Sequence, residues 1–292
     1  IVEEDNFDEE EALNQIVEPK TKDGNIYTLG KHRLMCGDST KSGDVKKLMN
    51  GQMAKLIITD PPYNVNYEGG TGLKIQNDNM SNDAFYKFLY DTHTRMYENA
   101  EAGCPAYIFH SDTEGVNFRK AFIDAGFKLS ECLVWVKNSL VLGRQDYHWR
   151  HEPILYGWKE GAAHFWYGDR DKTTVIEDEF NIDKLTKEEM KEIITHLMFV
   201  NENSTVIREK KPTKNGIHPT MKPLKLISKL VHNSSNKGDI VMDLFGGSGS
   251  TMMTCEQLDR ICYMMELDPK YCDVIIDRWE TLTGQKAVLL DK

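Results

Sequence analysis

No stretch of the 292-residue chain is apolar for long enough to cross a membrane, and no signal peptide is visible. The six cysteines form no Cys-x-x-Cys pair, so we expect reduced, mostly buried thiols in a cytoplasmic protein and no zinc site. No internal repeat divides the chain. The length and the 40% hydrophobic content suffice for one large α/β domain with an insertion, or for two domains.

Charge is unevenly distributed along the chain, whose formal net charge is -10. Residues 1–24 hold nine acids and two lysines, so they carry -7 and the remainder only -3. This composition predicts a solvated, flexible acidic arm. The chain begins without Met, and we therefore expect it to be part of a longer polypeptide.

A carboxylate, two prolines and an aromatic ring follow a short apolar run. Residues 55–58 read as a buried strand, and Thr59-Asp60-Pro61-Pro62-Tyr63 comes directly after it. An oxygen of Asp60 and a backbone carbonyl held by the prolines can accept both N–H groups of a flat amine, and Tyr63 can stack on its plane. This arrangement would position an amino group for alkylation. The competing interpretation is an ordinary turn.

A second ligand site is predicted near the other end of the chain. Residues 238–245 read as a buried strand that contains Asp243, a glycine-rich turn follows at 246–251, and the next strand, 262–267, contains Glu266. Glycines let a nucleotide approach the backbone, and an acid after the second strand accepts bonds from ribose hydroxyls. No Lys-Ser or Lys-Thr pair follows the glycines, so the turn is not a P-loop.

The side chains around this turn favour a cationic ligand. Asp243 would repel a diphosphate and attract an ammonium or sulfonium group, which favours S-adenosylmethionine as cofactor. The alternative is a turn whose glycines serve only close packing of strand and helix. Elsewhere, predicted strands and helices alternate, which implies an α/β sheet.

The two sites, in this order, resemble the β-group of DNA amino-methyltransferases, which modify adenine N6 or cytosine N4. The resemblance covers roughly Tyr27 to Trp279 and rests on Asp60-Pro61-Pro62-Tyr63, on the turn from Asp243 to Gly249, and on Glu266. Two further motifs match, Gly37-Asp38 and the segment from His218 to Pro223. For Asp38 a helix-cap role is an equal alternative.

The resemblance implies a Rossmann-like methyltransferase fold, with a mostly parallel sheet flanked by helices and a small target-recognition insertion. It divides the chain into the acidic arm 1–24, a catalytic half 25–161, the insertion 162–215 and a cofactor-binding half 216–292. It also implies roles for individual residues. The catalytic residues would be Asp60, Pro61, Pro62 and Tyr63, and the cofactor contacts would be Asp38, Asp243, Phe245, Gly247, Ser248, Gly249, Glu266, Leu267, His218, Thr220 and Lys222.

The activity implied is sequence-specific methylation of double-stranded DNA by S-adenosylmethionine on a flipped-out base. Asp60 at the first motif position favours adenine N6 over cytosine N4, and the absence of a Pro-Cys pair argues against cytosine C5 chemistry. The alternatives are a cytosine-N4 enzyme, an RNA or protein-amide methyltransferase, and a non-catalytic DNA-binding subunit. The family often dimerises, and the chain would belong to a restriction-modification or phage system.

DNA contacts are expected outside the catalytic motif. The glycine-containing segment 64–83 would close on DNA or cofactor. The stretch 137–152 is rich in donors and stacking rings. The basic cluster near 208–214 is expected to contact DNA, and the alternative is a solvated charged face. Metal ligation by His148 and His151 is not expected, because alkyl transfer from a sulfonium needs no metal. The predicted DNA-binding residues are Lys137, Asn138, Arg144, Gln145, Tyr147, His148, Arg208, Lys210 and Lys211.

Overall fold

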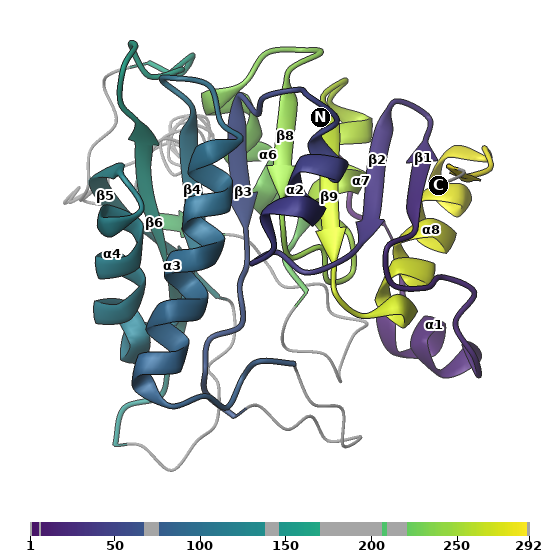
Figure 1. The fold of residues 1–292 in the computed structure, drawn as a ribbon, viewed down its shortest axis with the longest axis horizontal. Helices are drawn as coiled ribbons and strands as arrows, with labels where there is room; N and C mark the ends of the chain where they lie inside the picture. The colour runs from purple at the N-terminus through teal and green to yellow at the C-terminus, as the bar shows by residue number, and fades with distance from the viewer. Residues whose placement is uncertain are drawn as a thin grey trace, which may run out of the picture.

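The computed structural model describes residues 2–5, 7–66, 76–137, 146–169, 206–208 and 221–290. In these ranges ten strands form one sheet, in the order β10-β1-β2-β9-β8-β3-β4-β6-β5-β7 (Figure 1). The strands are β1 (Ile26–Leu29), β2 (His32–Cys36), β3 (Leu56–Thr59), β4 (Pro105–Phe109), β5 (Phe127–Val136), β6 (His151–Lys159), β7 (Val206–Arg208), β8 (Ile240–Asp243), β9 (Ile261–Glu266) and β10 (Val288–Leu289). The helices are α1 (Glu9–Gln15), α2 (Ser42–Met49), α3 (Asn82–Glu98), α4 (Gly115–Asp124), α6 (Leu224–Ser234), α7 (Ser250–Gln257) and α8 (Pro269–Thr283), with a 3-10 turn at Asp112–Glu114.

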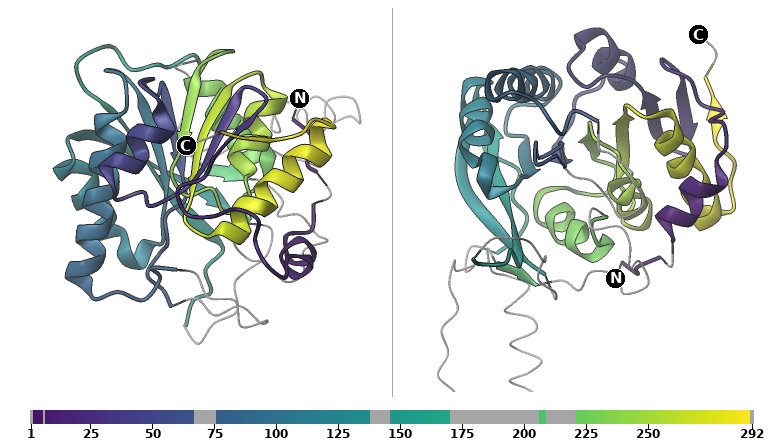
Figure 2. Two further views of the ribbon diagram at one scale, coloured as in Figure 1. Left: turned by 45° about the vertical axis from the view of Figure 1, so that its right-hand side comes forward. Right: turned by 90° about the horizontal axis from the view of Figure 1, so that it is seen from below.

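The middle of the sheet is parallel. Strands β2, β9, β8, β3 and β4 pair in parallel, whereas β1 and β10 are antiparallel additions at one edge and β6 runs antiparallel to both β4 and β5. The carboxyl ends of the parallel strands therefore meet at one edge. That edge is at the bottom of Figure 1, where the arrow of β9 points, and it faces the viewer in the right panel of Figure 2.

Helices cover both faces of the sheet, giving three layers. Along β3, Leu56 and Ile58 pack into one core with α6, α7 and α8, whereas Ile57 packs into the other core with α2, α3 and α4. The alternation follows from the two-residue period of a strand, and both sides are apolar because both are covered. The predicted α/β methyltransferase sheet with flanking helices is confirmed.

The two predicted halves of the chain form one sheet. Strands β8 and β9, from the cofactor half, lie between β2 and β3, from the catalytic half. The ranges 25–161 and 216–292 are therefore two parts of the chain that fold together into one sheet. Of the predicted insertion 162–215, only residues 162–169 and 206–208 are described.

The described residues of the acidic arm lie against the domain, whereas its composition predicts a solvated, flexible segment. Residues of the arm form α1, which packs on α8. The carboxylate of Glu4 accepts bonds from the N–H groups of Leu224 (3.0 Å) and Lys225 (2.9 Å) at the start of α6, and Asp5 forms a two-point ion pair with Arg278. A carboxylate at a helix N-terminus satisfies free donors and favours the helix dipole. The local composition could not reveal these distant partners.

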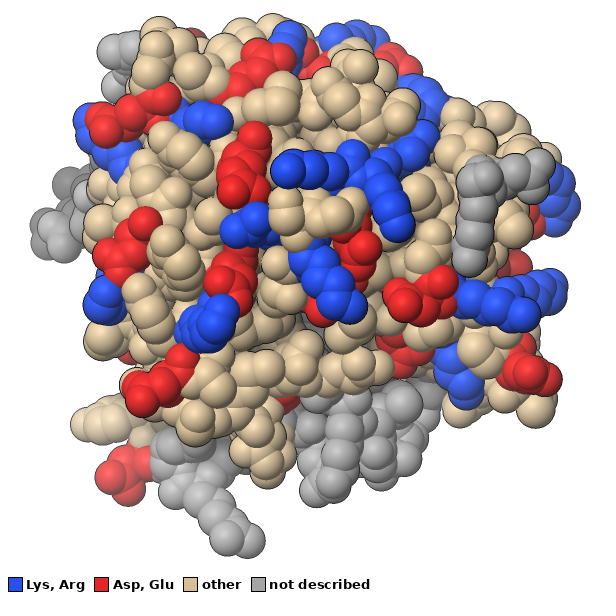
Figure 3. Space-filling model, in the orientation of Figure 1, with Lys and Arg blue, Asp and Glu red and all other residues tan. Residues whose placement is uncertain are grey.

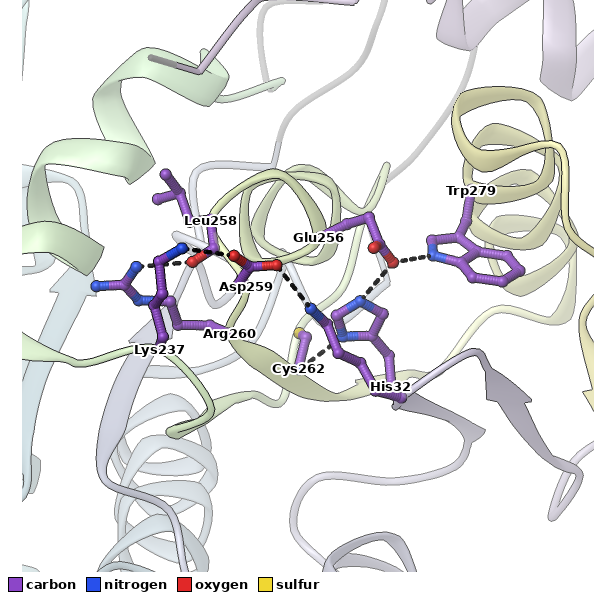
Figure 4. Close-up of polar contacts among 9 residues, drawn as sticks. His32, Lys237, Glu256, Leu258, Asp259, Arg260, Cys262 and Trp279 are labelled. Carbon is purple, nitrogen blue, oxygen red and sulfur yellow. Dashed lines mark hydrogen bonds and ion pairs between the residues drawn. The ribbon is translucent and has the colours of Figure 1, made fainter.

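A buried histidine joins three elements on the α7 side of the sheet (Figure 4). Nδ1 of His32 in β2 accepts a bond from the backbone N–H of Cys262 in β9 (2.8 Å), so its proton is on Nε2, which donates to Glu256 of α7 (2.9 Å). Glu256 also accepts a bond from the Trp279 indole of α8 (2.9 Å). The hydrogen bond from His32 is the main cause that lowers the pKa of Glu256 to about 2.

Candidate active site

The two predicted sites lie at the ends of neighbouring parallel strands. Strand β3 leads into Asp60 and β8 ends at Asp243, and the two strands pair through Leu56–Val241 and Ile57–Met242. The hydroxyl of Thr59 donates to the carboxylate of Asp243 at 2.7 Å. Thr59 directly precedes Asp60, so one buried hydrogen bond joins the predicted amine platform to the start of the glycine turn.

Asp60 lies in a cluster of charged and polar side chains. One oxygen accepts the hydroxyl of Tyr63 at 2.5 Å, and the other pairs with the ammonium group of Lys222. Burial raises the pKa of Asp60, and the positive charge of Lys222 opposes this rise without cancelling it. The Tyr63 ring packs edge-on against Phe118, with ring centroids 6.5 Å apart. Tyr63 and Lys222 thus fix the carboxylate in place.

The glycine turn between β8 and α7 has room for a ligand at one position. Gly247 (φ 51°) and Gly249 (φ 85°) adopt the left-handed conformation that glycine favours. A Cβ on Gly246 would lie 3.0 Å from the Met264 sulfur, whereas a Cβ on Gly247 would meet no atom within 4 Å. Gly246 and Gly249 therefore lie close to packed side chains, whereas Gly247 borders open space.

Two carboxyl groups border the same turn, Asp243 buried and Glu266 half-buried. Asp243 accepts bonds from Thr59 and from the backbone N–H of Phe245 (3.1 Å), and Glu266 accepts the N–H of Gly247 (2.8 Å). Burial raises the pKa of each to about 7. A cationic ligand would favour the ionised form of Asp243, and hydroxyl donors suit Glu266. These residues fit the amino acid and ribose parts of S-adenosylmethionine.

The other described cofactor candidates lie around this edge. Leu267 follows Glu266 and is 38% exposed, and Asp38 lies beside it because β2 pairs with β9. Asp38 does not cap α2: it accepts bonds from the N–H and hydroxyl of Thr40. The hydroxyl and carbonyl oxygens of Ser248 accept bonds from Arg278. The predicted contact of Lys222 with the cofactor stays a prediction, and His218 and Thr220 lie outside the described residues.

The predicted DNA contacts stay predictions, and the structure places only some of these residues on the surface. Tyr147 (90% exposed) and His148 lie on the surface, as DNA contacts require. Lys137 does not, because its side chain is 10% exposed and pairs with Glu152, so it offers no free ammonium group to a phosphate. Arg208 belongs to β7, whose side chains are not described. Asn138, Arg144, Gln145, Lys210 and Lys211, with residues 67–75 of the 64–83 segment, lie outside the described residues.

Surface charge gives no independent indication of a DNA-binding face in the view of Figure 3. Basic and acidic side chains are interspersed there over the α2, α3 and α8 side. No helix of the described residues is long and apolar enough to cross a membrane. Nor do these residues contain a group of three or more His, Cys, Asp or Glu side chains that could hold a metal ion.

Glu152 is a member of the site that sequence reasoning did not assign. Its Oε2 lies 3.1 Å from the Tyr63 hydroxyl and 3.3 Å from the Lys222 nitrogen, and its Oε1 pairs with Lys137. Glu152 reaches this edge because β6 is antiparallel, which places its first residues beside the carboxyl ends of the parallel strands. The sequence signal for Glu152 was its position directly before an apolar run, residues 153–156.

A profile of the DNA methylase family matches residues 54–277, which is most of the chain. The chain belongs to the DNA methylase family. The predicted family of amino-methyltransferases, and with it the prediction of an enzyme that methylates DNA, is thereby confirmed. Both candidate sites, from Asp60 to Glu266, lie inside the matched range.

Individual relatives agree with this assignment. The type II methyltransferase M.HpaI of Haemophilus parainfluenzae is 26% identical over 253 residues, covering 85% of this chain and 74% of the relative. The DNA adenine methyltransferase YhdJ of Escherichia coli is 24% identical, covering 84% and 83%. A putative DNA modification methylase of Thermus thermophilus, solved with S-adenosylmethionine, superposes with a TM-score of 0.59 at 20% identity, covering 88% and 96%.

Proposed function

We propose that the chain transfers a methyl group from S-adenosylmethionine to the N6 amino group of adenine in double-stranded DNA, at a specific sequence. The observation that carries the proposal is the bond between Thr59 and Asp243, because it joins the amine platform at Asp60 to the glycine turn. Family membership supports the substrate class, and the Thermus thermophilus complex supports the methyl donor. The name of YhdJ supports adenine.

The side chains of the candidate site have different roles. When bound, S-adenosylmethionine supplies a methyl group that a nitrogen lone pair can attack. Asp243 would accept hydrogen bonds from the ammonium group of the cofactor's amino acid part, and Glu266 would accept those from the ribose hydroxyls. Asp60 and a backbone carbonyl of the following prolines would accept the two N–H groups of adenine, and Tyr63 would hold the plane of the base.

Asp60 has a second use in this scheme. The amino nitrogen gains positive charge as the bond to carbon forms, and it must afterwards lose a proton. A carboxylate beside it stabilises that charge. Because burial raises the pKa of Asp60, this group is also suited to receive the proton. The base must leave the DNA duplex to reach Asp60, since its amino group is inaccessible inside a duplex.

Competition between substrate classes tests the proposal. The chain is incubated with labelled S-adenosylmethionine and equal amounts of double-stranded DNA, RNA and protein. We expect label in DNA. Label in RNA or in glutamine side chains alone would overturn the assignment, and no transfer together with no cofactor binding would indicate a non-catalytic subunit.

A further inference from the structure

Both oxygens of Asp60 already have hydrogen-bond or ion-pair partners. Oδ1 accepts from the Tyr63 hydroxyl, and Oδ2 pairs with Lys222. If Asp60 holds the target amino group, as proposed above, at least one oxygen must also accept an N–H from the base. A buried ammonium group on the same carboxylate weakens it as an acceptor, and it repels the positive charge that develops on the nitrogen. Efficient transfer therefore requires another anionic partner for the Lys222 ammonium group.

Glu152 is within reach of both partners of Asp60. Its Oε2 lies 3.1 Å from the Tyr63 hydroxyl and 3.3 Å from the Lys222 nitrogen, slightly farther than Asp60 in each case. A hydroxyl has one proton and can donate to only one of two carboxylates at a time. A charge-assisted bond to Glu152 at the usual length of about 2.8 Å would require Lys222 to move by only about half an ångström.

Neighbouring lysines keep Glu152 charged and fix its position. Lys137 pairs with its other oxygen, Oε1, and lies over the Trp135 ring, 5.3 Å from the centroid. The Glu152 side chain is 13% exposed, and Glu152 is the second residue of β6, where it pairs with Trp135 of β5. Burial alone would raise the pKa of Glu152, but Lys222 and Lys137 outweigh burial and leave the pKa below its ordinary value.

We propose that Glu152 is a positioning residue that takes over Lys222 and the Tyr63 hydroxyl when Asp60 accepts the target amino group. The inference rests on the proposed function. It assigns the two acids different tasks: Asp60 contacts the base, and Glu152 holds the counter-charge away from the reacting nitrogen. With Lys137 and Lys222, the two carboxylates form a cluster of zero net charge. Neutralising Glu152 would leave Lys222 bound to Asp60 and a net positive charge beside the amine.

Single-turnover methylation at saturating DNA and cofactor tests the inference. We expect Glu152→Gln to lower the rate constant about 100-fold while the cofactor Kd, from calorimetry, stays within about twofold of wild type. In the double variant with Lys222→Gln no ammonium group is left to hold Asp60, and we expect at least about tenfold recovery over Glu152→Gln alone. A merely structural role for Glu152 would predict no recovery. Asp91→Asn, which neutralises an acid paired with Lys87 on the surface of α3, is the matched control and should retain the wild-type rate.

Two results would overturn the inference: a Glu152→Gln rate constant within about threefold of wild type, or a double variant no faster than Glu152→Gln. If Glu152→Gln does not fold, as judged by thermal unfolding, Glu152→Asp decides the question. It keeps the buried charge but withdraws it from Lys222, so about a tenfold loss supports the inference and a wild-type rate refutes it. Failure of the proposed function is distinguishable, because wild-type protein would then not methylate DNA at all.

Discussion

Cofactor affinity should depend on pH because of Asp243. Burial raises the pKa of this carboxyl from 3.8 to about 7, despite hydrogen bonds from Thr251, Thr59 and the Phe245 N–H. A shift of about three pKa units corresponds to about 4 kcal/mol of free energy that disfavours the ionised form in the ligand-free protein. The proton-bound form is therefore the resting state below about pH 7, and a cationic ligand must displace that proton.

The proton on Asp243 determines how stability and cofactor affinity change with pH. The folded chain retains a proton that the unfolded chain releases near pH 4, so the contribution of Asp243 to stability is present at low pH and decreases as pH rises from about 4 to about 7. Binding of a cation below pH 7 releases the proton. The cofactor Kd should therefore fall about tenfold per pH unit between about pH 5.5 and 7 and level off above that.

Calorimetry from about pH 5.5 to 7.5 measures this slope, and buffers with different ionisation enthalpies count the released proton. The cofactor amino group stays protonated below about pH 7.5, so the titrating group belongs to the protein. Asp243→Asn is the control, since an amide of similar shape cannot ionise, so its weaker binding should lose the share of the slope that Asp243 causes. Any slope that remains belongs to Glu266, whose pKa burial also raises to about 7. A wild-type Kd that is constant with pH, or the same slope in Asp243→Asn, would refute the reasoning.

Three further predictions concern other contacts. Asp60→Ala should lower methyl transfer at least about 1,000-fold in a radiolabel assay while the cofactor Kd changes less than about threefold; equal loss of both would contradict the separate roles of the two sites. Thr59→Val removes a buried hydroxyl from Asp243, so the unfolding free energy in urea should fall by about 1–3 kcal/mol, and the pH midpoint of cofactor binding should move upward; an unchanged midpoint would argue against the coupling. Glu256→Gln should lower the unfolding free energy by about 2 kcal/mol at pH 7. This difference in unfolding free energy should become smaller as pH falls from about 4.5 towards 2, because protonation of the wild-type carboxylate in that range removes its stabilising contribution. A difference that does not depend on pH would exclude this cause.

Carboxylates at strand ends could be predicted from the sequence. Asp60, Asp243 and Glu266 each lie at the end of a short apolar run, and parallel strands bring such ends to one edge. The hairpin of residues 26–36 and helix α3 follow from equally local patterns. For these parts the burial pattern along the chain is sufficient, because both faces of the sheet are covered.

Strand β6 could not be predicted in this way. It contains Pro153 and Gly157, both of which disfavour a central strand. Pro153 lies beyond the end of β4, where its carbonyl accepts the His110 N–H at 3.1 Å. Gly157 is required because a Cβ there would come within 2.1 Å of the Lys128 carbonyl oxygen. The same strand contributes Glu152, whose partners are distant in the chain, so its role emerges only in three dimensions.

The identity of the methylated nucleoside tests the central claim most directly. Unmethylated double-stranded DNA is treated with the protein and S-adenosylmethionine, digested, and analysed by chromatography and mass spectrometry, with the Asp60→Ala variant as the blank. The proposed function predicts N6-methyl-2′-deoxyadenosine, absent from the blank. N4-methyl-2′-deoxycytidine alone would contradict the choice of adenine, and the absence of any methylated nucleoside would contradict the proposed activity.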